Sequence, residues 1–243
     1  MSIAERLDAV RGRIAAAARA AGRDPVSVRL LPISKTVDDD RLREAVAAGC
    51  TQLGENKVQE AAGKAERLAD LGISWSLVGH LQTNKARHAA RFIDEFQALD
   101  SLRLAEELDR RLQALGRGID VMVQVNTSGE STKFGLAPDD VAPFVAQLPA
   151  FSSLRVRGLM TLAEFTSDLE RVRGCFVRLR TLRDRLRQDA PDGVSFDDLS
   201  MGMSGDFELA IAEGATVVRV GTAIFGARPT PDSDYWPGFA APR

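Results

Sequence analysis

The chain has 243 residues, of which 44% are hydrophobic, so it can bury a sizeable core as one large domain or two small ones. Its 32 basic and 34 acidic residues nearly cancel to a net charge of -2, which argues against a nucleic-acid partner. The two cysteines, Cys50 and Cys175, lack the spacing of a disulfide framework or a zinc site, and a reducing cytosol fits them best.

The N-terminal residues predict an amphipathic helix. Apolar residues recur at helical spacing from Ile3 to Ala18, and this pattern ends near Gly22. Charged residues interrupt the segment, so it does not have the apolar core of a signal peptide. No later segment approaches the roughly 20 apolar residues that a bilayer span needs. We therefore expect a cytoplasmic protein with no membrane partner.

Strands and helices are then predicted in alternation. The first strand is an apolar run at residues 28–33, and Asp38 begins the helix that follows it. Pro32 weakens this strand, but a missing hydrogen-bond donor is tolerable near a strand's end. The seven further strands are predicted at residues 51–54, 75–78, 96–99, 119–125, 156–160, 196–199 and 216–220, with helical patterns between them.

Strict alternation over this length favours an α/β fold, a single (β/α)8 TIM barrel with an extra N-terminal helix. A doubly wound open sheet has the same local pattern, and periodicity does not exclude it. Since no repeat or linker marks a boundary, we predict one barrel domain over residues 1–228 and a C-terminal tail over 229–243. Residues 128–149, the longest departure from the alternation, and the proline-rich tail are both predicted as loop or terminal structure.

The first candidate for chemistry is Lys35, which follows the first predicted strand. A barrel builds its site at the carboxyl ends of its strands, so this amine would project toward the barrel mouth. There it could form a Schiff base with an aldehyde, provided that burial or neighbouring cations lower its pKa enough to supply free amine. Taken alone, a lysine in this place is more often a solvated loop charge.

The second candidate follows the last two predicted strands, in residues 200–206 and 219–222. Barrels often bind phosphate with these two loops, through glycine backbone, hydroxyl donors and the positive end of a short helix. Ser204, Gly221 and Thr222 supply those groups. Ordinary turn chemistry is the alternative, with Ser204 capping the next helix and Gly221 ending a strand. A lysine and a phosphate cradle together suit pyridoxal 5′-phosphate.

Other familiar catalytic motifs are missing from the sequence. It contains no GxxxxGK[ST] phosphate loop, no GxGxxG fingerprint, no GxSxG elbow and no HExxH pair. His80 and His88 are the only histidines, too few for a histidine-rich metal site, and a structural or surface role is the simpler interpretation of both. We therefore predict no metal site.

Motifs spread over residues 30 to 228 resemble, in order, those of the pyridoxal phosphate homeostasis protein family. These motifs are Ser34-Lys35-Thr36, Gly54 to Glu60, Gly79 to Lys85, Val125 to Ser128, Gly158 to Met160, Ser200 to Asp206 and Val218 to Gly226. The family is similar to the barrel domain of alanine racemase, the N-terminal domain of that enzyme. Ser76 stands where the family often has a histidine, which puts in doubt only the local role of that position.

The resemblance implies a barrel that holds pyridoxal 5′-phosphate as a Schiff base, with no established enzymatic turnover and therefore no catalytic residue. The positions that it implies for binding the cofactor are Lys35, Asn56, Ser204, Arg219, Gly221 and Thr222. The lysine would carry the Schiff base, and the three residues of the last two loops would hold the phosphate. Asn56 would line the cofactor, and Arg219 would face the pyridine nitrogen.

Arg219 gives a physical reason to expect holding rather than catalysis. A guanidinium against the ring nitrogen keeps that nitrogen unprotonated, because two positive charges repel in a poorly solvated site. The ring is then a weaker electron sink, and carbanion chemistry is discouraged. In the alternative, Arg219 faces the helices in an ion pair, and the flanking Val218 and Val220 point inward.

We therefore expect a monomeric carrier that buffers pyridoxal 5′-phosphate and supplies it to apo-forms of enzymes that depend on it. The alternative is an amino-acid racemase, which needs an acid or base on each face of its substrate. Alanine racemase takes one of these groups, a tyrosine, from a second domain that this chain ends too soon to contain. The only tyrosine here, Tyr235, falls in the tail. A barrel for another phosphate ester is a third reading.

Overall fold

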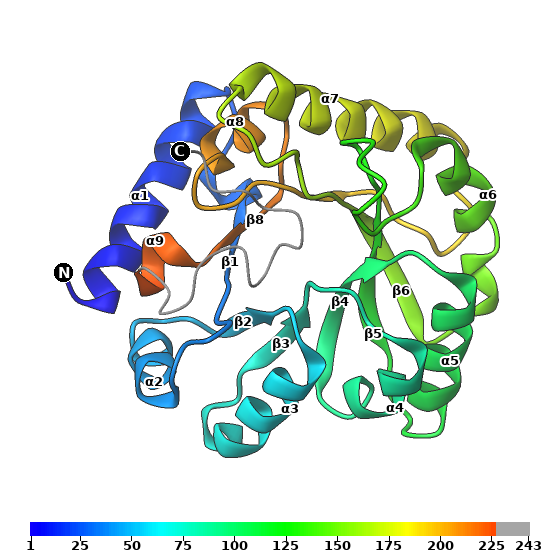
Figure 1. The fold of residues 1–243 in the computed structure, drawn as a ribbon, viewed down its shortest axis with the longest axis horizontal. Coiled ribbons are helices and arrows are strands. Elements are labelled where there is room, and N and C mark those ends of the chain that lie inside the picture. Colours follow the sequence, from blue (N-terminus) through cyan, green and yellow to red (C-terminus); the bar gives the residue numbers. More distant parts are fainter. Residues whose placement is uncertain (227–243) are drawn as a thin grey trace.

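The computed structural model describes residues 1–226, which form an eight-stranded sheet that curls into a nearly closed barrel (Figure 1). The strands are β1 (Arg29–Pro32), β2 (Gln52–Glu55), β3 (Ser74–Leu77), β4 (Ile93–Leu99), β5 (Ile119–Gln124), β6 (Leu154–Met160), β7 (Asp198–Ser200) and β8 (Val217–Val220). Every pairing between neighbouring strands is parallel, in the order β1-β8-β7-β6-β5-β4-β3-β2. The two ends of that order meet at one bridge, between Ile33 and Gly54. The predicted (β/α)8 barrel is therefore confirmed over the open sheet.

Helices follow the strands and cover the outside of the barrel. They are α1 (Ile3–Ala20), α2 (Asp39–Ala47), α3 (Val58–Arg67), α4 (Ala86–Ala89), α5 (Leu102–Gln113), α6 (Val141–Val145), α7 (Leu169–Leu186), α8 (Phe207–Ala212) and α9 (Thr222–Phe225). Short 3-10 turns occupy residues 25–27, 69–71, 83–85, 138–140, 148–150 and 187–189. All of these elements belong to one layer of helices around one parallel sheet, the arrangement that the alternating pattern predicts.

Helix α1 is the predicted extra helix before the barrel. Its first turn is closed by a capping box, in which the Ser2 hydroxyl accepts from the Glu5 N–H and the Glu5 carboxylate accepts from the Ser2 N–H. The helix stops where Gly22 takes a left-handed φ of 68°. Its apolar face packs against α8, α9 and α2, so it covers the junction between the last strand and the first (Figure 1).

The segment 128–149, predicted as a loop, contains helix α6 in its second half, so that prediction is wrong there. This region buries the side chains of Val141, Phe144, Val145 and Leu148. Their spacing of three or four residues is that of one face of a helix. The sequence prediction missed this helix because it contains Pro143, and proline usually interrupts a helix. Pro143 lies in the first turn of α6, where its missing N–H costs no intrahelical bond.

The predicted strands differ from the observed ones by one to three residues at their ends, and β4 and β7 illustrate this. Strand β4 begins at Ile93, three residues before its predicted start. The prediction missed these residues because the charged side chains of Asp94 and Glu95 interrupt the apolar pattern. Strand β7 begins at Asp198, so that Phe196 precedes the strand although its side chain is buried. Such boundary shifts are common, since the ends of elements carry the weakest periodic signal.

The tail predicted over residues 229–243, and Tyr235 within it, lie outside the described residues. The division of the chain at residue 228 therefore stays a prediction. Within the described part, no helix combines the length and the apolar character that crossing a membrane requires.

Candidate functional site

Lys35 and Gly221 lie at the ends of two strands that are hydrogen-bonded to each other. Just past β1, the Ile33 N–H donates to the Val220 carbonyl at the end of β8, with a nitrogen–oxygen distance of 2.9 Å. Gly221 follows directly, and a Cβ added there would lie 3.2 Å from the Ile33 carbonyl oxygen. Lys35 stands two residues beyond Ile33 and is only 9% exposed, so it is not a solvated loop lysine. Main-chain pairing therefore holds the predicted lysine beside the predicted phosphate loop.

The loops after β7 and β8 also meet each other, through Ser204. Its hydroxyl oxygen accepts from the Gly221 N–H at 3.3 Å and from the Ala223 N–H at 3.5 Å. Both distances are long, so a charged phosphate oxygen would be a stronger acceptor for these N–H groups. The alternative in which Ser204 caps the helix at Phe207 is wrong, because Asp206 occupies the N-cap position of α8. Thr222 begins α9 and is exposed.

Asn56 follows β2 and brings an unpaired acceptor to the same end of the barrel. Its side-chain Oδ1 is buried and has no hydrogen-bond partner among the described atoms. The end of β1 lies alongside, because the Ser34 N–H donates to the Gly54 carbonyl at 2.9 Å. A buried amide oxygen without a donor is costly, so Asn56 marks a place where a ligand or a water can donate a hydrogen bond.

Arg219 points into the barrel. Its side chain is 3% exposed and donates to the Ser200 hydroxyl at 2.6 Å and to the Thr161 carbonyl at 2.7 Å. The alternative in which Arg219 faces the helices is therefore wrong. Burial lowers the pKa of Arg219 to about 10, although the nearby Asp206 carboxylate raises it, so the guanidinium still carries its charge at neutral pH.

A chain of hydrogen bonds, which we call the polar column, continues from Arg219 across the barrel interior. The Ser200 hydroxyl donates to Gln97 Oε1 at 2.6 Å, and Gln97 Nε2 donates to Glu95 Oε2 at 2.9 Å. Glu95 pairs in turn with Arg29, at 2.6 Å between Oε1 and Nη2. Two neutral side chains thus connect the buried guanidinium to a buried carboxylate, and each bond in such a chain polarises the next.

Ser76, the departure from the family pattern, also takes part in the polar column. Its hydroxyl donates to Glu95 Oε2 at 2.6 Å, and its side chain is buried. The column as a whole was not predicted from the sequence. Its one visible signal is the pair of polar residues Glu95 and Gln97, which alternate within a strand and so share its inner face.

Asp100, directly after β4, is a further acidic group at the carboxyl ends of the strands that the sequence did not single out. Burial raises the pKa of its carboxyl, while the charge of His80 and the Gly135 N–H lower it. The folded state therefore binds this proton more tightly than the unfolded chain does. The stability that this proton contributes is fully present at low pH and is lost as the pH rises through the folded-state pKa.

We expect the free energy of unfolding of Asp100→Asn to rise relative to that of the parent protein as the pH rises from about 4 to about 7. The amide oxygen still accepts from the Gly135 N–H, and the amide never ionises. Urea unfolding at both pH values measures the difference. The exposed Asp192→Asn serves as the control, and a gap between parent and Asp100→Asn that does not change with pH would contradict the prediction.

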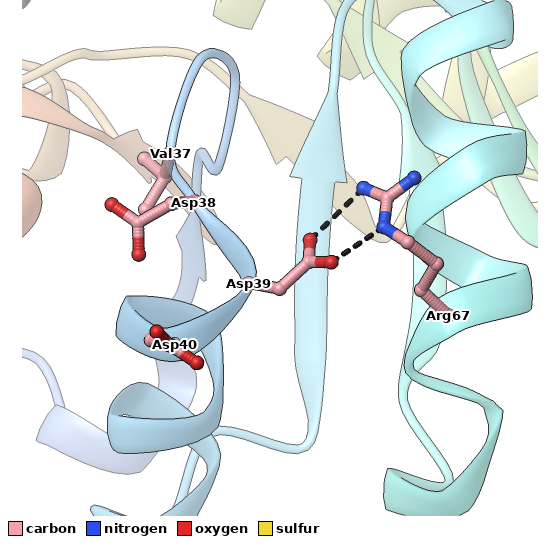
Figure 2. Close-up of a pocket in the computed structure, with 5 residues that line it drawn as sticks. All are labelled: Val37, Asp38, Asp39, Asp40 and Arg67. Carbon is pink, nitrogen blue, oxygen red and sulfur yellow. Dashed lines mark hydrogen bonds and ion pairs between the residues drawn. The ribbon is translucent and has the colours of Figure 1, made fainter.

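A shallow recess of about 350 Å³ lies beside the start of α2, and Figure 2 shows the residues around it. The residues that line it are Val37, Asp38, Asp39, Asp40 and Arg67. The single guanidinium, that of Arg67, is already paired with Asp39 at 2.5 Å. Because three carboxylates would repel a phosphate, the recess does not belong to the candidate site.

The two histidines lie apart from any cluster of metal-ligating side chains. His80 stacks on the Phe134 ring, with ring centroids 3.9 Å apart and planes 8° from parallel, and His88 is exposed. Among residues 1–226 no group of three or more histidine, cysteine, aspartate or glutamate side chains has the arrangement to hold a metal ion.

The residues at the barrel mouth fit a ligand that carries both an aldehyde and a phosphate. Lys35 supplies a buried amine, and the Ser204 hydroxyl with the Gly221 and Ala223 N–H groups supplies phosphate donors. The unpaired Asn56 oxygen supplies an acceptor. The sequence predicted all of these positions except Ala223, whose N–H becomes visible only when the backbone geometry is known.

Comparison with known proteins finds a matching family model, similar sequences and similar solved structures. The family model for the alanine racemase N-terminal domain matches residues 6–229. A pyridoxal phosphate homeostasis protein from Pseudomonas aeruginosa is 44% identical over 227 residues, which cover 93% of this chain and 96% of that protein. A crystal structure of a protein from Bifidobacterium adolescentis has a TM-score of 0.85 and 39% identity, covering 92% of this chain and 94% of its own. PipY of Synechococcus elongatus, solved with PLP bound, has a TM-score of 0.82 and 40% identity, covering 93% of this chain and 100% of its own.

Proposed function

Because the chain belongs to the pyridoxal phosphate homeostasis protein family, we propose that it binds pyridoxal 5′-phosphate and helps to keep the supply of that cofactor steady. The observation that carries the proposal is the pairing of β1 with β8, which holds Lys35 beside the donors of Gly221 and Ser204. The bound PLP in the related PipY structure supports the same ligand.

Each proposed contact assigns a part of the cofactor to a residue near the carboxyl ends of the strands. Pyridoxal 5′-phosphate supplies an aldehyde that reacts reversibly with an amine, and Lys35 is the proposed point of covalent attachment. The Ser204 hydroxyl, the Gly221 N–H and the Thr222 hydroxyl are proposed to bind the phosphate. Asn56 is proposed to line the cofactor. A ligand fixed at both of its ends is held in one orientation.

Arg219 supports a holding role over catalysis. We propose that its guanidinium faces the pyridine nitrogen and keeps it unprotonated, since the polar column holds the charge of Arg219 inside the barrel. A neutral pyridine withdraws electrons weakly and stabilises a carbanion poorly. The relatives are named homeostasis proteins, and we extend this to the absence of catalytic turnover in this chain.

The proposed role includes buffering the free cofactor and supplying it to apo-forms of enzymes that use it. Transfer to those apo-enzymes, a monomeric state and a place in the cytoplasm remain predictions. Light scattering measures the oligomeric state directly.

Borohydride reduction after incubation with pyridoxal 5′-phosphate is expected to fix the pyridoxyl group on Lys35, as read by peptide mass mapping. Lys35→Ala should lose the label, whereas Lys85→Ala, a matched change on a partly exposed lysine, should keep it. The protein in D2O is also expected to leave the α-hydrogen of alanine in place. A label on another lysine, or Lys35-dependent deuterium exchange, would overturn the respective part of the proposal.

A further inference from the structure

Lys64, on helix α3, is a second buried lysine, and all of its hydrogen bonds go to residues around Lys35. Its side chain is 3% exposed. The Nζ donates at 2.7 Å to each of three acceptors, which are the Ser34 carbonyl, Glu55 Oε1 and Glu60 Oε1. An ammonium has three N–H donors, so every donor of Lys64 is used.

These bonds tie the backbone on both sides of Lys35 to helix α3. Lys64 binds the Ser34 carbonyl, which directly precedes Lys35. On the other side, the Thr36 N–H donates to Glu60 Oε1 at 2.6 Å, and that same oxygen is held by Lys64. The peptide units that flank Lys35 are therefore both anchored to one pair of side chains, Glu60 and Lys64, one turn apart on α3.

Thr36 needs this anchoring because its backbone is strained. Its φ is 63°, and within residues 1–226 it is the one non-glycine residue with a positive φ. A β-branched residue in this region is strained and persists only where its surroundings enforce it. Hydrogen bonds to charged groups are stronger than those between neutral groups, so the two charged anchors can offset this strain.

The charges of the cluster explain why an ammonium is required at its centre. Burial raises the pKa of Glu55, although Lys64 and Ser34 lower it. Burial also raises the pKa of Glu60, but hydrogen bonds from Lys64 and from the Thr36 N–H outweigh that effect and leave it lowered. Without Lys64, two carboxylates would face each other in a poorly solvated space, and repulsion would separate α3 from the Lys35 segment.

We propose that Lys64 is a positioning residue for Lys35, holding the backbone from Ser34 to Thr36 in the conformation that places the amine beside the loops after β7 and β8. Lys64 acts through the backbone and forms no bond to the ligand, because its three donors are already used. The inference rests on the proposed function in one respect, the identity of the ligand that Lys35 receives.

The test compares Lys64→Met with Arg111→Met, which breaks an i,i+4 ion pair with Glu107 on the distant helix α5. In the protein without cofactor, amide hydrogen exchange over residues 34–37 is expected to be at least about tenfold faster in Lys64→Met, since an anchoring bond to a charged group is lost. With pyridoxal 5′-phosphate bound, release should also be at least about tenfold faster, and the pH midpoint of the visible absorption band should shift. Arg111→Met should match the parent in all three measurements.

A second pair of variants covers the case in which Lys64→Met does not fold. Glu60→Ala removes the acceptor of the Thr36 N–H, while Lys64 keeps its bonds to Ser34 and Glu55. Exchange at Thr36 is expected to accelerate in Glu60→Ala and to stay near the parent rate in Glu60→Gln, whose amide oxygen still accepts.

The outcomes separate this inference from the proposed function. If the parent protein takes up no pyridoxal 5′-phosphate, the proposed function fails, and the exchange measurements on the cofactor-free protein still decide the role of Lys64. Parent-like exchange and parent-like release in a folded Lys64→Met would overturn the inference, as would parent-like exchange at Thr36 in Glu60→Ala.

Discussion

Valine in place of Gly221 is expected to weaken the binding of pyridoxal 5′-phosphate about 10- to 100-fold while the barrel stays folded, since overpacking costs about 1–3 kcal/mol. A Cβ at this position already lies 3.2 Å from the Ile33 carbonyl oxygen, and the two methyl groups of valine need more room. The loop after β8 must then move away from the end of β1. That movement separates the phosphate donors from Lys35, which stands two residues beyond Ile33. Titration of the cofactor-free protein, followed by absorption, measures the affinity.

Gly12→Val is the control for this prediction. Gly12 lies on α1, is exposed, and has no atom within 4 Å of an added Cβ. Valine there should leave the affinity close to that of the parent. Equal losses in the two variants would contradict the specific role of the β1–β8 junction.

Methionine in place of Arg219 is expected to lower the free energy of unfolding of the cofactor-free protein by about 3 kcal/mol. The substitution leaves the Thr161 carbonyl and the Ser200 hydroxyl oxygen without their donor inside the barrel. It also removes a positive charge close to the Asp206 carboxyl, whose pKa is already raised by burial. Breaking one side of a buried charged network costs far more than the same change at the surface. Urea unfolding measures the loss.

Arg110→Met is the surface counterpart of this change. Arg110 pairs with Glu107 at 2.7 Å, but its side chain is 58% exposed, and such pairs contribute only about 0–1 kcal/mol. If Arg219→Met lowers the free energy of unfolding no more than Arg110→Met does, the polar column tolerates the removal of its guanidinium. That result would also contradict the role of the column in keeping the Arg219 guanidinium charged and in position.

The barrel was predictable because its signals are local. Alternating apolar strands and amphipathic helices can be recognised in short windows, and glycine with serine after the last two strands is recognisable in the same way. The polar column was not predictable, because its members are far apart in the sequence. Ser200 and Gln97, for example, are 103 positions apart and meet only when the sheet closes.

Lys64 illustrates a second limit. Within a predicted helix, a lysine four residues after Glu60 has the spacing of an ordinary surface ion pair. Nothing in the local sequence distinguishes it from Arg111, which does pair with Glu107 near the surface. Only the bonds of Lys64 to Ser34 and Glu55, which follow from the tertiary fold, show that this lysine is buried. The positive φ of Thr36 likewise follows from tertiary contacts and has no sequence signal.

The packing of α1 against α8 and α9 has a consequence for biosynthesis. Helix α1 leaves the ribosome long before α8 and α9, against which it packs, and β1 likewise precedes β8, its hydrogen-bonded neighbour. Until then, the apolar face of α1 and one edge of β1 are open to chaperones or to misassembly. The segment that carries Lys35 therefore gains its β8 neighbour only after β8 has been translated, and the proposed site at Lys35 is not complete before then.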